Sequence, residues 1–152
     1  MRYFEDFTVG ETIDCGRRTV TKEEIVAFAK DFDPQPFHVD EAAAARSRYG
    51  GLIASGWHSC CLCMRLAVDA VLGDAANMGS PGMDKIRFLK PLRPGDTINA
   101  KLRVVEATPS RSKPDRGRLT FAFELYNQSG ELIMDMTAMA IFHRRPTAGA
   151  RA

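Results

Sequence analysis

The sequence lacks any uninterrupted apolar run long enough to cross a membrane as a helix. Its first ten residues, MRYFEDFTVG, contain charges and no apolar block, so we expect no secretory signal. We therefore expect no membrane partner and a cytoplasmic location. The chain also lacks a strong charge of one sign. Its formal net charge of +2 over 152 residues is too small to favour nucleic acid as a main partner.

Cysteine is scarce and is not spaced for a metal. The four cysteines are Cys15, Cys60, Cys61 and Cys63, and three of them fall in one apolar helical pattern. Cys61 and Cys63 would point to different faces of that helix, and no second Cys or His cluster has matching spacing. We expect no metal site, and we expect free thiols, buried or half-buried, in a reducing compartment.

The length suits one domain, and a hydrophobic content of 45% is ample for a core. We expect a single domain over residues 1–146. From Pro146 the chain becomes small and polar, so residues 147–152 are predicted to form a disordered tail.

The first half of the sequence predicts one strand and then helices. Residues 12–20 are predicted to form a strand. Thr21 and Glu24 form a capping box, followed by apolar residues at helical spacing, which predicts a helix over 22–31. A short helix is expected over 41–47. A long apolar helix is expected from about Ser55 to a stop at Gly73, with an apolar stripe through Trp57, Cys60, Cys61, Met64, Val68 and Val71.

The second half predicts strands at 84–90, 99–107, 118–127 and 131–145, separated by turn signals. The alternating pattern favours antiparallel pairing with one buried face. A sheet with its helices gathered on one face is an α+β architecture, and the long helix is the natural object for that sheet to curve around.

The segment DFDPQPFH is the main candidate for chemistry. Asp33 and His38 flank a stretch that two prolines restrict, and each proline biases its predecessor, Asp33 or Gln35, towards an extended conformation. A carboxylate and an imidazole held together can grip one water molecule and move its proton. The alternative is structural, because Asp-Pro is a common turn starter and a lone loop histidine is usually a surface group.

At these residues the chain resembles a known family. The run D-P-Q-P-F-H (residues 33–38) resembles the motif D-x-N-P-x-H of the MaoC-like dehydratases and the R-specific enoyl-CoA hydratases. The runs G-G-L-I-A-S-G (50–56) and D-K-I-R-F-L-K-P-L-R-P-G-D (84–96) are similar to the family's later segments. The resemblance covers residues 3–143 in the same order.

This resemblance implies a hotdog fold, in which a curved antiparallel sheet wraps around one long central helix. It implies that Asp33 and His38 activate water, and that the backbone N–H of Gly56 contacts the thioester oxygen. The chain departs from the pattern at three positions: Gln35 replaces the usual Asn, Phe32 a common Gly, and Ser55 a frequent His. Changes at 32 and 55 are expected to reshape the acyl pocket.

The expected contact at Gly56 also has a physical basis. Free N–H groups at a helix start favour negative charge, and an enolate places such charge on the thioester oxygen. Further candidate substrate contacts are Ser55, Gln35, Trp57, His58 and Ser59. For His58 we favour a structural hydrogen bond, and Ser59 either donates to substrate or caps its own turn.

The strand half is locally basic, and CoA or a phosphopantetheine carrier would bring phosphates. The loop 109–117 is the best single candidate for a nucleotide contact, although most of these basic residues are expected to be solvated. We expect no cofactor other than the CoA or phosphopantetheine that carries the substrate.

Three functions compete. The first is a hydro-lyase that acts reversibly on a 2-enoyl or (R)-3-hydroxyacyl thioester. The second is a thioesterase on the same fold, and the third is a non-catalytic acyl-binding subunit. Under each function we expect a homodimer or a higher homo-oligomer, because a long exposed edge strand gains from pairing.

Overall fold

The computed structural model describes residues 1–146. The predicted tail, 147–152, lies outside the described residues. The elements follow in the order η1 (Phe4–Asp6), β1 (Thr12–Thr19), α1 (Lys22–Phe32), α2 (Pro36–Val39), α3 (Glu41–Arg46), α4 (Gly56–Ala67), η2 (Val68–Leu72), β2 (Gly82–Phe88), β3 (Thr97–Pro109), β4 (Arg116–Tyr126) and β5 (Leu132–His143).

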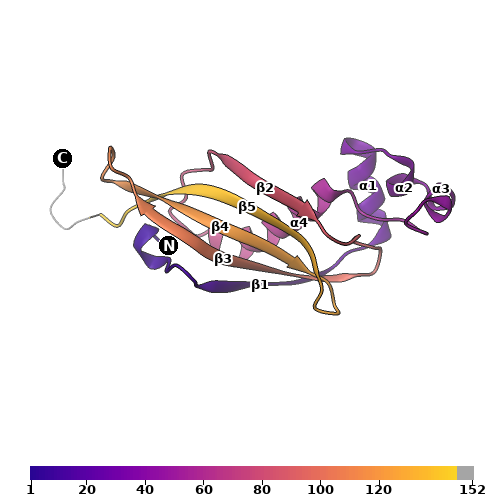
Figure 1. Cartoon of the computed structure of the whole chain (residues 1–152), viewed down its shortest axis with the longest axis horizontal. Coiled ribbons are helices and arrows are strands. Elements are labelled where there is room, and N and C mark those ends of the chain that lie inside the picture. The colour runs from indigo at the N-terminus through magenta and orange to yellow at the C-terminus, as the bar shows by residue number, and fades with distance from the viewer. Residues whose placement is uncertain (147–152) are drawn as a thin grey trace.

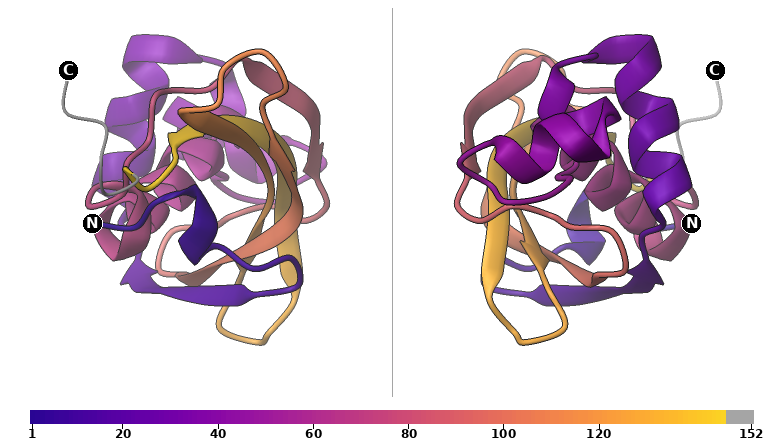
Figure 2. Two further views of the ribbon diagram at one scale, coloured as in Figure 1. Left: turned by 90° about the vertical axis from the view of Figure 1, so that its left-hand side faces the viewer. Right: turned by 90° about the vertical axis from the view of Figure 1, so that its right-hand side faces the viewer.

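The strands form one antiparallel sheet in the order β1-β3-β4-β5-β2, with β1 and β2 at the edges. The sheet curves around α4, as the end-on views in Figure 2 show. Helices α1, α2 and α3 gather at one end of the sheet, and the β3–β4 connection lies at the opposite end (Figure 1). The predicted α+β architecture, a curved antiparallel sheet around one helix, is confirmed.

The core lies between the concave face of the sheet and α4. Alternate residues of β3 are buried, as the period-two pattern requires, and α4 contributes its own buried side chains. Burying each large apolar side chain contributes roughly 1.5–3 kcal/mol, so this layer dominates stability. The residues that meet here include Ile98, Ala100, Leu102, Val104, Phe121, Phe123, Leu62, Cys63, Leu66 and Ala67.

The predicted stripe on the long helix was only partly right, because Cys60 and Val71 are buried in the core and Met64 packs against it, but Val68 is 39% exposed. Trp57 and Cys61 are exposed, whereas Ser59, Leu62 and Cys63 face the core. The helix is apolar on most sides, so periodicity alone did not identify the buried face. The helix also does not continue regularly to Gly73, because Val68–Leu72 form a π-helical turn that the Gly73 N–H closes onto Val68 O at 2.9 Å.

The cysteines are free, as expected, but Cys61 is exposed rather than buried. Burial raises the pKa of Cys15 and Cys60 to about 11 and that of Cys63 to about 12. Within residues 1–146, no group of three or more His, Cys, Asp and Glu side chains is placed to hold a metal ion. No helix in the same range is long and apolar enough to cross a membrane.

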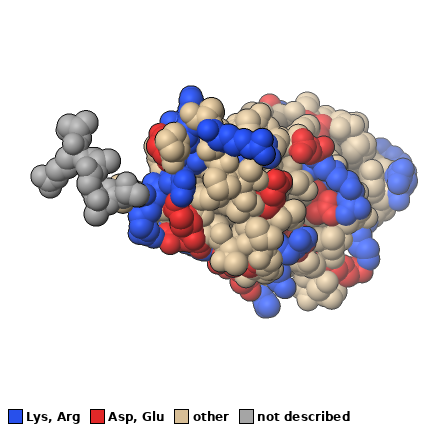
Figure 3. Space-filling view, turned by 60° about the vertical axis from the view of Figure 1, so that its left-hand side comes forward, with Lys and Arg blue, Asp and Glu red and all other residues tan. Residues whose placement is uncertain are grey.

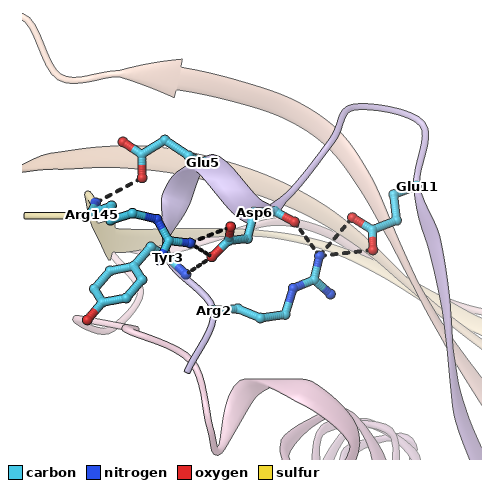
Figure 4. Close-up of polar contacts among 6 residues, drawn as sticks. All are labelled: Arg2, Tyr3, Glu5, Asp6, Glu11 and Arg145. Atoms are coloured by element: carbon cyan, nitrogen blue, oxygen red, sulfur yellow. Dashed lines mark hydrogen bonds and ion pairs between the residues drawn. The ribbon is translucent and has the colours of Figure 1, made fainter.

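Ion pairs join the two ends of the described chain (Figure 4). The Arg145 guanidinium donates to both carboxylate oxygens of Asp6 at 2.7 Å, and Arg144 pairs with Glu5 at 2.8 Å. Arg2 pairs with Glu11 at 2.9 Å. Each exposed pair contributes little by itself, but together they hold η1 against the end of β5.

Candidate active site

A cavity of about 490 Å³ opens at the helical end of the sheet, where α1, α2 and α4 meet the end of β2. It brings together six of the residues that the sequence predicted for the site. These are Asp33, Gln35, His38, Gly56, Trp57 and Ser59. Ser55 contacts the cavity indirectly, through a hydrogen bond to Asp33.

Local backbone structure brings the acid and the histidine together. Asp33 caps the C-terminus of α1, with its N–H bonded to Ala29 O at 2.8 Å. We had expected an extended tether with Asp33 and Gln35 both extended, and this was only partly right, because Asp33 (φ −154°, ψ 68°) lies outside the extended region. Gln35 is extended (φ −68°, ψ 144°), but Pro36 starts the one-turn helix α2, which suits proline because its first position needs no N–H donor. This turn places His38 Nε2 3.3 Å from Asp33 Oδ2.

The orientation of His38 is fixed by its other ring nitrogen. The ring is 4% exposed, and Nδ1 lies 2.7 Å from Ile53 O. A carbonyl oxygen can only accept, so Nδ1 carries the proton in this contact. In the neutral ring, Nε2 is then an unprotonated nitrogen that faces the Asp33 carboxylate.

Asp33 is held as a carboxylate. Burial alone would raise its pKa, but a hydrogen bond from Gln35 to Oδ1 and one from Ser55 Oγ to Oδ2, each 2.7 Å, lower it, and a positive charge on His38, when that ring is protonated, lowers it further. The pKa of Asp33 therefore lies below its ordinary value. The Gln35 amide makes this bond at the position where the resemblance had suggested Asn.

Gly56 begins α4 next to this pair. No acceptor for its N–H is found within residues 1–146, and the residue lines the cavity. The first N–H groups of a helix carry partial positive charge, so this donor suits an anionic oxygen. Gly56 is also needed for packing, because a Cβ atom here would lie 2.5 Å from Cζ of Phe88.

His58 is oriented away from these groups. It does not line the cavity, and its ring stacks on Phe28 with centroids 4.5 Å apart and planes 8° apart. The expected structural hydrogen bond was wrong for Nδ1, which is buried and has no partner in the described part of the chain. Burial lowers the pKa of His58. Ser59 is buried and lines the cavity, whereas the Trp57 side chain is 59% exposed at its edge.

Of the cations near the site, Lys90 belongs to the basic strand half that the sequence had suggested, whereas Arg48 does not. The loop 109–117 lies at the other end of the same chain (Figure 1) and does not line this cavity, whereas Arg48 and Lys90 do. Sequence reasoning missed Arg48 because it sits in an irregular segment with no pattern. Elsewhere charges of both signs are interspersed, as the face shown in Figure 3 illustrates.

A curved antiparallel sheet around one helix (Figure 2) is the hotdog fold. The comparison with protein families agrees. The family model described as "MaoC like domain" matches residues 6–120. The chain belongs to the MaoC-like dehydratase family, as the resemblance predicted.

Individual relatives support this assignment. The crystal structure of the MaoC-like dehydratase from Rhodospirillum rubrum superposes with a TM-score of 0.91 at 41% identity, covering 97% of this chain and 100% of that one. The 3-hydroxybutyryl-CoA dehydratase of Methylorubrum extorquens is 33% identical over 73% of this chain and 69% of its own length. The uncharacterized protein YdeM of Bacillus subtilis is 34% identical over 82% of this chain and 86% of its own.

Proposed function

We propose that this protein is a hydro-lyase that reversibly hydrates a 2-enoyl thioester of CoA or an acyl-carrier protein to the (R)-3-hydroxyacyl thioester. The observation that carries the proposal is the 3.3 Å approach of His38 Nε2 to Asp33 Oδ2, in a cavity that the Gly56 backbone also lines. The relationship to a 3-hydroxybutyryl-CoA dehydratase and to a MaoC-like dehydratase supports the same reaction type.

The two side chains divide the work on one water molecule. The Asp33 carboxylate accepts one O–H and orients the water, because its lowered pKa makes it a weak base. His38 Nε2 takes the other proton, because its Nδ1–H is committed to Ile53 O. The water oxygen bonds to C3, and the double-bond electrons move to the thioester oxygen. Nε2–H then protonates C2, which completes the addition of one water.

The enolate that forms in between needs a donor at its oxygen. The Gly56 N–H, at the positive end of α4, supplies it without any rearrangement of the backbone. Removing one donor of this kind typically costs about 3–4 kcal/mol of barrier. The donor stabilises the transition state of both hydration and dehydration, since both pass through the same enolate.

The test is incubation with crotonyl-CoA. Loss of the enoyl absorbance without release of free thiol supports hydration, whereas thiol release would make the protein a thioesterase. Asp33→Asn and His38→Ala should each lower the turnover by about 10²–10⁴ while the fold is retained. Wild-type turnover in both folded variants would reject the site, and no turnover of any enoyl thioester by the wild type would favour a non-catalytic acyl-binding subunit.

We also propose a homodimer formed through β2. As an edge strand, β2 directs half of its backbone groups away from β5. Its side chains include Met83 and Phe88, which are 47% and 54% exposed. A second copy of β2 would pair with these backbone groups and cover this apolar surface.

A further inference from the structure

Ser59 is a buried serine whose hydroxyl the protein itself does not use. Its side chain is 6% exposed and lines the candidate active-site cavity. A serine inside a helix commonly bonds to the carbonyl oxygen four residues earlier. Here Ser55 O accepts the Ser59 backbone N–H at 3.2 Å, and Ser59 Oγ has no hydrogen-bond partner within residues 1–146. Ser59 therefore does not cap its own turn, which leaves its hydroxyl available to a ligand.

The Ser59 hydroxyl is open to the cavity rather than sealed in the core. Among the side chains of residues 1–146, a polar atom that is both sealed and without a partner is found at His58 Nδ1. Ser59 Oγ also lacks a partner but is not sealed, and the residue is otherwise buried, so its access is through the cavity that it lines. A hydroxyl in this setting has its full capacity for hydrogen bonding unspent.

The position of Ser59 in α4 directs this hydroxyl towards Gly56. The two residues are three apart, so they lie on one face of the helix, about 5–6 Å from each other. The Cα–Cβ bonds of a helix tilt towards its N-terminus, which points the Ser59 side chain at the turn that Gly56 begins. Gly56 has no side chain of its own to stand between them. The Ser59 hydroxyl and the Gly56 N–H can therefore reach one ligand oxygen.

The surroundings strengthen a hydrogen bond formed at this place. Ile53, Leu92 and Ile133 line the same cavity and are 7%, 2% and 1% exposed. In such apolar surroundings a hydrogen bond to a negative oxygen is stronger than in water. A neutral thioester carbonyl is a weaker acceptor than an enolate oxygen, so a donor here stabilises the enolate more than the bound substrate.

We propose that the Ser59 hydroxyl is a second donor to the thioester oxygen, beside the Gly56 N–H. This inference rests on the proposed function and extends it to a residue that transfers no proton. Asp33 and His38 act on the water molecule, and His38 returns the proton to C2. Ser59 keeps its own proton throughout, and its hydrogen bond strengthens as the double-bond electrons move to the thioester oxygen.

The first test separates turnover from binding. Ser59→Ala should lower kcat for crotonyl-CoA about 10²-fold, the loss typical of one donor to a developing negative oxygen. KM should change little, because the donor acts mainly on the enolate. Ser59→Thr keeps the hydroxyl and should recover most of the lost kcat. Wild-type kcat in Ser59→Ala would overturn the proposal.

The second test asks whether the hydroxyl is structural. Ser59→Ala removes a buried hydroxyl without a partner and introduces a better helix former, so its midpoint of urea denaturation should equal or exceed that of the wild type. The matched control is Cys60→Ala, at a neighbouring residue of α4 that is buried in the core and does not line the cavity. It should lower the midpoint and leave kcat unchanged. A lowered midpoint for Ser59→Ala would mean that the hydroxyl supports the fold, which would contradict the proposal.

The third test observes the hydrogen bond itself. Crotonyl-CoA with an isotopic label at its thioester carbonyl carbon is bound to Asp33→Asn, in which turnover is slow, and the C=O stretch is recorded by infrared difference spectroscopy. Each hydrogen bond to the oxygen polarises the carbonyl and lowers its stretching frequency. Adding Ser59→Ala should raise the frequency, whereas adding Cys60→Ala should not. Equal frequencies with and without Ser59→Ala would overturn the proposal even if kcat had fallen.

These outcomes also separate this inference from the proposed function. If the wild type hydrates crotonyl-CoA and depends on Asp33 and His38, but Ser59→Ala keeps the wild-type kcat and the same carbonyl frequency, this inference fails and the proposed function stands. If the wild type turns over no enoyl thioester, both fail.

Discussion

Ser55 Oγ connects the start of α4 to Asp33. It accepts the Trp57 N–H at 3.3 Å, which caps the helix, and it donates to Asp33 Oδ2 at 2.7 Å, which stabilises the carboxylate. One buried hydroxyl therefore sets both the position of the Gly56 donor and the charge of the acid. The proposed position of the water molecule, beside Asp33, and that of the enolate oxygen, at the Gly56 N–H, therefore both depend on this hydroxyl.

Ser55→Ala should shift the acid limb of the kcat/KM profile to higher pH. Removing the hydroxyl raises the pKa of Asp33 towards its ordinary value, so the carboxylate is lost at a higher pH than in the wild type. Losing the cap should also cost about 1 kcal/mol of unfolding free energy. The matched control is Thr21→Ala, which removes the cap of α1 with no contact to Asp33. Equal pH profiles for both variants would contradict the role of Ser55.

Gly56→Ala should weaken substrate binding in the cavity more than it lowers the stability of the fold. The new methyl group would lie 2.5 Å from the Phe88 ring, so the ring must move, and Phe88 lines the cavity. Because the clash is with the far end of a side chain that is 54% exposed, the ring can turn aside, so we expect a loss of at most about 1 kcal/mol in unfolding free energy and a higher KM for crotonyl-CoA. Adding Phe88→Leu should restore most of the stability, with Phe88→Leu alone as the control. If Gly56→Ala has the stability and the KM of the wild type, the close approach of position 56 to the Phe88 ring is unimportant.

His58 should make stability depend on pH. Burial lowers its pKa, so between the unfolded value of about 6.5 and the lower folded value the unfolded chain binds more protons. Its contribution to unfolding free energy is complete above about pH 6.5 and is lost as the pH falls below it. His58→Phe keeps an aromatic ring against Phe28 and should flatten this decline. The free energy of unfolding is measured by urea denaturation at pH 7.5 and at pH 5.5 for the wild type and for His58→Phe. If it falls equally in both proteins, His58 is not the cause.

Met83→Asp should weaken the β2 dimer. A carboxylate on this exposed edge would be buried against a second copy, which is unfavourable without a partner charge. Light scattering should show a dimer for the wild type and a concentration-dependent shift to monomer for the variant. Val105→Asp, an exposed position on the interior strand β3, is the control and should remain dimeric. A monomeric wild type would reject the interface.

The sequence predicted the sheet, the central helix and the proximity of Asp33 to His38, because alternation, capping signals and the prolines are local. It missed α2, since a four-residue helix has no periodicity and depends on Pro36 at its first position. It missed the π-helical turn after Ala67 and the buried face of α4, because both depend on how the sheet packs on an almost uniformly apolar helix. Arg48 and Phe88 reach the cavity only through tertiary structure.

The ion pairs between η1 and the end of β5 have a practical consequence. Because Arg145 and Asp6 hold the two ends of the described chain together, a short linker could join them without stretching the sheet. New ends could then open in the turn between β4 and β5, around Gly130, which has positive φ and is exposed. A circularly permuted protein of this kind would keep every strand, but its new ends would lie at the helical end of the sheet (Figure 1), next to Glu131, whose ion pair with Lys90 reaches the cavity wall.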